Sequence, residues 1–83
     1  MSRKILITGT GQGKTFMAEL LAHHYWAAGV SHAVFHVGSR LEAERCVSNG
    51  VDFLIFVSND PSAVEQPWQT ITVAGGQIDG VAK

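Results

Sequence analysis

The sequence contains little cysteine and little charge, and each shortage excludes a class of protein. Cys46 is the only cysteine among 83 residues, so the chain can form no intramolecular disulfide and no cysteine-based zinc cluster. Charged residues make up 16% of the chain, the formal net charge is -1, and no basic run occurs, which argues against a nucleic-acid partner. We interpret Cys46 as a small buried residue of an expected helix rather than as a reactive thiol.

Long apolar runs are missing as well. No stretch approaches the roughly 18 consecutive apolar residues that span a bilayer, and Met1 to Lys4 leads into an expected strand rather than a signal sequence. We therefore expect a cytoplasmic protein with no membrane partner. With 46% hydrophobic residues, the chain has enough apolar surface for one core, so residues 1–83 are expected to form a single domain.

Short apolar, β-branched runs predict four strands, at residues 4–8, 31–37, 51–57 and 70–74. The run from Val51 to Val57 is the most hydrophobic and predicts a central strand. Residues 77–83 are compatible with a helical turn, the return strand of a hairpin or a frayed tail.

Good helix formers predict a first helix at 14–28, which Gly29 ends, and a second at 40–48. The buried face of the first helix is expected to carry Met17, Leu21, Tyr25 and Ala28. The second helix is expected to begin with a capping box, in which Ser39 is the N-cap and Glu42 the third helical residue. Asn59 or Asp60 before Pro61 predicts one further helical turn, ending at Glu65.

This alternation predicts a small three-layer α/β domain with a mostly parallel four-stranded sheet and right-handed crossovers. The spatial order 2-1-3-4 is expected. In that order the second strand lies at an edge, and its apolar "AVFHV" favours a homodimer. His32 and His36, on one face of this strand, are interpreted as satisfied or interface histidines rather than metal ligands.

The segment "ILITGTGQGKTF", Ile5 to Phe16, carries the clearest chemical signal. The phosphate-binding loop pattern G-x-x-x-x-G-K-[ST] joins a strand to a helix. Its glycines let backbone N–H groups surround a phosphate, its lysine contacts the terminal phosphates, and its hydroxyl binds magnesium. Gly13, Lys14 and Thr15 match the end of the pattern. The candidate nucleotide-binding residues of the loop are Gly9, Thr10, Gly11, Gln12, Gly13, Lys14 and Thr15.

The loop departs from this pattern in its spacing. Counted back from Gly13, the first glycine of the motif falls on Thr8; counted from Gly9, three residues intervene where four are expected. Either Thr8 takes the glycine position, or the loop is tightened and offers fewer N–H groups. Both alternatives weaken phosphate binding without excluding it. The remaining alternative is an ordinary glycine-rich turn between a strand and a helix.

Beyond the loop, the order of segments resembles the P-loop nucleotide kinases, in particular the phage-type deoxynucleoside monophosphate kinases. The resemblance is carried by "VGSRLEAERCVSNGVDFLIFV", Val37 to Val57, and by "ITVAGGQIDGVAK" from Ile71. It implies ATP or another nucleotide and magnesium as cofactors, with Arg40 as a further phosphate contact. The alternative for Arg40 is a solvated residue at a helix N-terminus.

The insertion and lid that such kinases carry have no counterpart here. The family also implies a carboxylate at the end of the strand that finishes at Val37, and no carboxylate stands there. Asp60 is the best substitute, so Thr15 and Asp60 are the candidate magnesium ligands, and no catalytic residue is assigned.

The sequence therefore predicts a minimal P-loop domain that binds a nucleotide or polyphosphate with weak or no turnover. The alternative is a non-enzymatic small phage or mobile-element accessory protein that acts through a protein partner. A third hypothesis is a kinase or ATPase that a partner subunit completes. Whether the chain is an enzyme stays open at this point.

Overall fold

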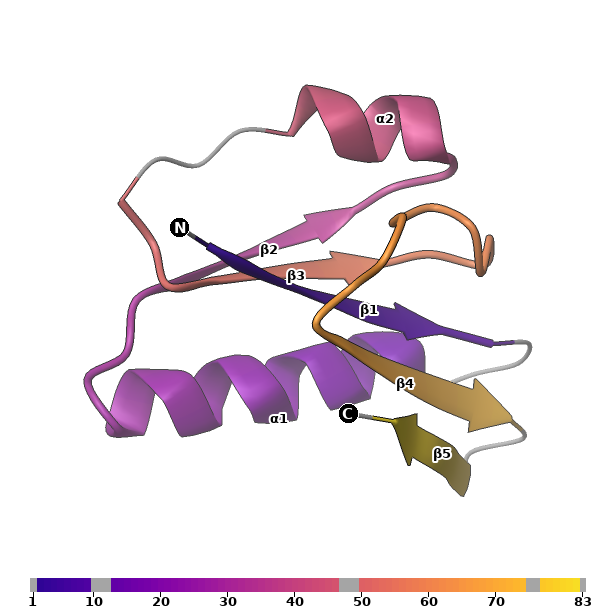
Figure 1. The fold of residues 1–83 in the computed structure, drawn as a ribbon. Coiled ribbons are helices and arrows are strands. Elements are labelled where there is room, and N and C mark those ends of the chain that lie inside the picture. Colours follow the sequence, from indigo (N-terminus) through magenta and orange to yellow (C-terminus); the bar gives the residue numbers. More distant parts are fainter. Residues whose placement is uncertain (1, 10–12, 47–49, 75–76, 83) are drawn as a thin grey trace.

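The computed structural model describes residues 2–9, 13–46, 50–74 and 77–82 (Figure 1). The elements in chain order are β1 (Arg3–Thr8), α1 (Lys14–Ala27), β2 (His32–His36), α2 (Arg40–Arg45), β3 (Phe53–Val57), β4 (Gln69–Ala74) and β5 (Gln77–Ala82). The expected α/β class is confirmed, and all four expected strands are present.

The strands form one sheet in the order β2-β3-β1-β4-β5. β2, β3, β1 and β4 run parallel, while β5 pairs antiparallel with β4. The expected order 2-1-3-4 therefore needs a correction, because β3 rather than β1 lies beside β2. β1 lies between β3 and β4, and β2 is an edge strand as expected.

The difference has a physical reason. Every residue of β3 is buried, and so are the last four residues of β1, which means that both strands need a neighbour on each side. Burial alone cannot decide which of the two lies next to β2. The crossover from β1 to β2 determines that β3 lies between them. The 14-residue helix α1 in this crossover contacts β1, β3 and β2, and so passes over β3.

Two apolar clusters cover the two faces of the sheet. On one face, α1 packs Met17, Leu21 and Tyr25 against a cluster that includes Ile5 and Ile55. On the other face, Ala43 of α2 and the buried pair Ala63 and Val64 pack against Leu6, Leu54 and Phe56. Figure 1 shows α1 and α2 on opposite sides of the sheet, which gives the expected three layers.

Local sequence signals account for the helix ends. Gly29 follows α1 with φ +73°, a conformation that suits glycine, although Ala28 is exposed and does not join the buried face. The N-cap of α2 is confirmed, because the Ser39 hydroxyl accepts a hydrogen bond from the Glu42 N–H at 3.4 Å. The second half of the expected capping box is shifted by one residue: the Glu42 carboxylate accepts from the N–H of Gly38, which precedes the N-cap, at 2.9 Å. α2 ends at Arg45, since Cys46 is extended, and residues 47 and 48 of the expected helix lie outside the described residues.

The helical turn expected up to Glu65 does not form. Residues 61–66 make turns and bends, and the Asp60 carboxylate just before them accepts from the Ser62 N–H at 2.9 Å. Too few residues lie between Pro61 and Pro67 to repay the cost of starting a helix. Of the three alternatives for the end of the chain, the return strand is the one observed, as β5.

The strand registers bring the carboxyl ends of β1, β2 and β3 to one edge of the sheet. Ile7 of β1 and His36 of β2 are both paired with Val57, the last residue of β3. Gly9, Val37 and Ser58 follow these strand ends directly. In open α/β sheets, ligands bind at this edge.

Candidate functional site

A cleft of about 300 Å³ lies at this carboxyl edge of the sheet. We call it the Lys14 cleft. Its lining residues come from the start of α1 and from the ends of β2 and β3: Lys14, Thr15, His36, Val37, Val57, Ser58 and Asn59. The structure thus brings two of the predicted phosphate-binding residues, Lys14 and Thr15, into one cleft with residues that lie more than twenty positions further along the chain.

The beginning of α1 is suited to an anion. Gly13 is the N-cap, so no side chain caps the helix, and the first turn contains no acidic residue. The first N–H groups of a helix have no intrahelical partner and carry a positive potential. Lys14 and Thr15 stand on this first turn, with Lys14 half-buried and Thr15 exposed. A lysine and a threonine therefore line the cleft at the N-terminus of the helix.

The two described glycines of the loop have backbone conformations that favour glycine. Gly9 has φ +129° and Gly13 has φ +112°. The Gly13 carbonyl accepts the hydrogen bond of the Met17 N–H at 2.9 Å and so starts the helix. Thr10, Gly11 and Gln12 lie outside the described residues.

Thr8, which the motif count aligns with the missing first glycine, is 4% exposed. Its hydroxyl oxygen has no hydrogen-bond partner among the described residues. A buried hydroxyl without a partner costs free energy, and such groups are rare in folded proteins. Thr8 directly precedes the glycine-rich loop, and the neighbouring Ser58 N–H donates to the carbonyl of Ile7 at 3.0 Å.

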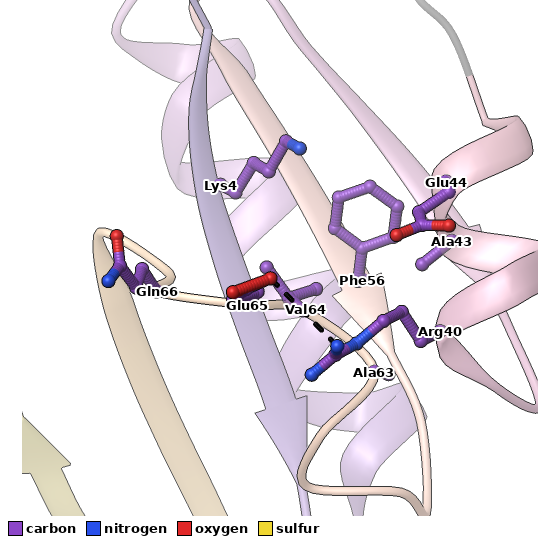
Figure 2. Close-up of a pocket in the computed structure, with 9 residues that line it drawn as sticks. All are labelled: Lys4, Arg40, Ala43, Glu44, Phe56, Ala63, Val64, Glu65 and Gln66. Atoms are coloured by element: carbon purple, nitrogen blue, oxygen red, sulfur yellow. Dashed lines mark ion pairs between the residues drawn. The ribbon is translucent and has the colours of Figure 1, made fainter.

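Arg40 is not brought into the Lys14 cleft. It lines a second cleft of about 280 Å³ between α2, β1, β3 and the segment after β3 (Figure 2). There its Nε donates to the Ser62 carbonyl at 3.1 Å, and its guanidinium lies 3.9 Å from the Glu65 carboxylate. Both side chains of this ion pair are largely exposed, so the pair contributes little stability.

The candidate magnesium ligands Thr15 and Asp60 differ in position. Thr15 lines the Lys14 cleft, whereas Asp60 is not among its lining residues. Asp60 uses its carboxylate to accept from the Ser62 N–H, and its own N–H donates to the Ser58 hydroxyl at 3.1 Å. No group of three metal-ligating side chains occurs in the part of the chain that the structure describes.

Three polar residues of the cleft were not singled out as site residues from the sequence, namely His36, Ser58 and Asn59. For His36 the sequence favours a satisfied or interface histidine. The signal that identifies them is their position directly at or after the ends of parallel strands, because those ends meet at one edge. Ser58 is 3% exposed, and His36 and Asn59 are exposed.

Comparison of the chain with protein-family models, with curated proteins and with solved structures gives no match. Within the described ranges, no helix is long and apolar enough to cross a bilayer.

Proposed function

We propose that this chain binds the phosphate groups of a nucleotide or another polyphosphate in the Lys14 cleft. The observation that supports this most directly is the meeting of Lys14, Thr15 and the uncapped start of α1 at the carboxyl edge of a parallel sheet. An ammonium neutralises phosphate charge, the helix N-terminus adds N–H donors, and a hydroxyl donates to a phosphate oxygen or binds an accompanying magnesium ion.

Thr8 gives independent support. Its buried oxygen precedes the loop and lacks a partner among the described residues. A hydroxyl in that position can hydrogen-bond the loop or a ligand held by the loop. In either case, Thr8 contributes a polar group where the usual motif has a glycine.

Weak or absent phosphoryl transfer belongs to this proposal. Transfer requires several cationic groups to stabilise the charge of the transferred phosphoryl group. Among the described residues that line the cleft, Lys14 is the only lysine or arginine, and Asp60 and Arg40 lie outside the lining. We therefore propose a domain that binds a nucleotide or polyphosphate on a scaffold related to the nucleotide kinases. Thr15 binds the accompanying magnesium ion.

Isothermal titration with ATP, ADP, deoxynucleoside monophosphates and tripolyphosphate, each with and without magnesium, tests the proposal. Binding by the wild type and a loss of about tenfold or more in Lys14→Ala are expected, since a charge-assisted hydrogen bond contributes about 1.5–3 kcal/mol. Lys4→Ala is the matched control, because Lys4 is also a lysine but lines the Arg40 cleft. Absence of binding, or equal binding by Lys14→Ala, would refute the proposal.

A second candidate function is protein–protein interaction without a nucleotide, as in a small phage or mobile-element accessory protein. The observation that favours it is the number of large apolar side chains exposed on α1: Phe16 is 65% exposed, Leu20 49% and Trp26 73%. If this is the function, Lys14→Ala should bind the protein partner as well as the wild type does. Leu20→Ser or Trp26→Ser should abolish binding of the partner. A kinase or ATPase completed by a partner subunit would instead release phosphate only when that partner is added.

A further inference from the structure

β2 is the outer strand of the parallel part of the sheet. Among the described residues it pairs with β3 alone, which leaves its second side open. An open strand edge presents a row of backbone donors and acceptors to which another strand can pair. β5, at the other end of the sheet, runs antiparallel to its neighbour, so β2 is the only parallel edge in the described sheet.

The hydrogen bonds at the two ends of β2 show which backbone groups point outward. The Ser31 carbonyl accepts from Phe53, the first residue of β3, and from Asp52 just before it, and the Val37 N–H donates to the carbonyl of Val57. Odd-numbered residues therefore direct their backbone groups toward β3. Because the direction alternates along a strand, the backbone groups of His32, Val34 and His36 point away from the sheet.

The three residues with outward-pointing backbone groups, His32, Val34 and His36, are placed symmetrically about Val34. If a second β2 runs antiparallel to the first with Val34 opposite Val34, then His32 of each copy lies opposite His36 of the other. All three pairs have outward backbone groups, so each pair can exchange both of its N–H···O hydrogen bonds. A two-fold axis through Val34 thus satisfies the open edge completely.

β2 also lacks the features that normally prevent edge pairing. Its sequence, HAVFH, contains no lysine, carboxylate or proline, and its pairing with β3 runs in continuous register. Next to its amino end lies a cleft of about 440 Å³ lined by Trp26, Gly29, Val30, Ser31 and His32. In the symmetric register, residues 37 and 38 of the second copy lie beside residues 31 and 30, at this cleft.

We propose that two copies of this chain associate through antiparallel β2 strands centred on Val34, which joins the two sheets into one. The partner is a second copy because the edge is complementary to itself. The exposed Trp26 in the cleft beside the edge provides apolar surface for the same contact. Since His36 lines the Lys14 cleft as well, the second copy borders that cleft in the dimer.

Charged substitutions at positions 32 and 36 test the proposed antiparallel register, in which His32 of one copy lies opposite His36 of the other. In His32→Lys/His36→Lys, lysines face each other in two symmetry-related pairs, and the dissociation constant of the dimer should rise about tenfold or more. In His32→Lys/His36→Glu, the same positions form opposite-charge pairs, and the dimer should be retained or strengthened. Sedimentation equilibrium from micromolar to millimolar concentration measures the dissociation constant of the dimer for each double variant. Circular dichroism verifies that both variants are folded.

A second measurement uses the unmodified chain and so does not depend on the folding of a variant. Amide hydrogen exchange by NMR should show Val34 and His36 gaining protection as the protein concentration rises, while Phe35, whose N–H faces β3, is protected throughout. A wild type that stays monomeric over the whole range would overturn the proposal. Equal dissociation constants for the two double variants would overturn the register. Neither readout requires a nucleotide, so the result is independent of phosphate binding.

Discussion

A side chain on Gly9 would overlap the backbone of Val73, because an added Cβ would stand 2.9 Å from both the nitrogen and the carbonyl carbon of Val73 and closer still to its oxygen. Gly9 directly follows β1, at the point where the loop leaves the sheet, and Val73 is a buried residue of the adjacent β4. The φ of Gly9 is +129°, which side chains rarely adopt.

Gly9→Ala is therefore expected to lower the free energy of unfolding by about 3 kcal/mol or more, from combined backbone strain and overlap. Urea unfolding measures the change. Gly29→Ala is the matched control, since Gly29 has φ +73° but open space around its Cβ position. It should cost only about 1 kcal/mol of backbone strain. If Gly9→Ala and Gly29→Ala lower the free energy of unfolding by similar amounts, the close approach of Gly9 to β4 makes no contribution to stability.

Thr8→Val separates folding from ligand binding. Valine keeps the shape of threonine and removes the hydroxyl that has no partner among the described residues, so the ligand-free chain should be stabilised by about 1 kcal/mol. If that oxygen serves a phosphate held by the loop, affinity for the ligand should fall in the same variant. Unfolding and titration experiments on one preparation give both values. A loss of stability would mean instead that the hydroxyl bonds within the protein.

Ionisation of the Tyr25 phenol is expected to lower the free energy of unfolding at alkaline pH. Burial raises the pKa of the Tyr25 phenol above its ordinary value of 10.0, and the nearby charge of Arg3 opposes this effect. The folded state then holds the phenol proton more tightly than the unfolded state. The stabilisation is complete below the unfolded pKa of about 10 and is lost as pH rises through the folded pKa.

Tyr25 is the only tyrosine, so its ionisation can be followed directly by phenolate absorbance. In the folded protein this titration should have a midpoint above that of the urea-unfolded protein. In Tyr25→Phe, stability should decline less between pH 9 and pH 11 than in the wild type. Phenylalanine keeps the stack on Phe53, whose ring centroid lies 4.4 Å from that of Tyr25. Identical pH profiles for the two proteins would contradict the assignment.

Ser39→Ala removes the cap of α2. The short helix has few other stabilising contacts, and its only buried residue is Ala43, so the loss of the cap should cost about 1 kcal/mol. Thermal unfolding measures the effect. Ser39→Asp keeps an acceptor at the N-cap and should restore most of the stability, whereas an unchanged midpoint in Ser39→Ala would show that the cap contributes nothing.

Much of the fold could be predicted from the sequence because local signals determine it. The apolar runs gave the strands, Gly29 and Ser39 marked helix boundaries, and the spacing of Met17, Leu21 and Tyr25 identified the buried face of α1. The position of β3 between β2 and β1 could not be predicted in this way. β1 and β3 are both apolar enough to be interior strands, and only the path of α1 distinguishes the two orders.

The candidate site was predictable in part for the same reason. Lys14 and Thr15 belong to a local motif, and the structure brings them into one cleft. His36, Ser58 and Asn59 join that cleft only through the pairing of distant strands. Arg40 follows β2 as expected, but α2 directs it toward the segment after β3, where Glu65 and the Ser62 carbonyl hold it.

The most direct test of phosphate binding is a crystal structure of the chain with ATP and magnesium. The proposal predicts density for the phosphates at the start of α1, with the Lys14 ammonium and the Thr15 hydroxyl within hydrogen-bond distance of the phosphate or its magnesium ion. The Arg40 cleft serves as an internal control in the same crystal. Phosphate density beside Arg40 and none at Lys14, at saturating ATP, would contradict the proposal.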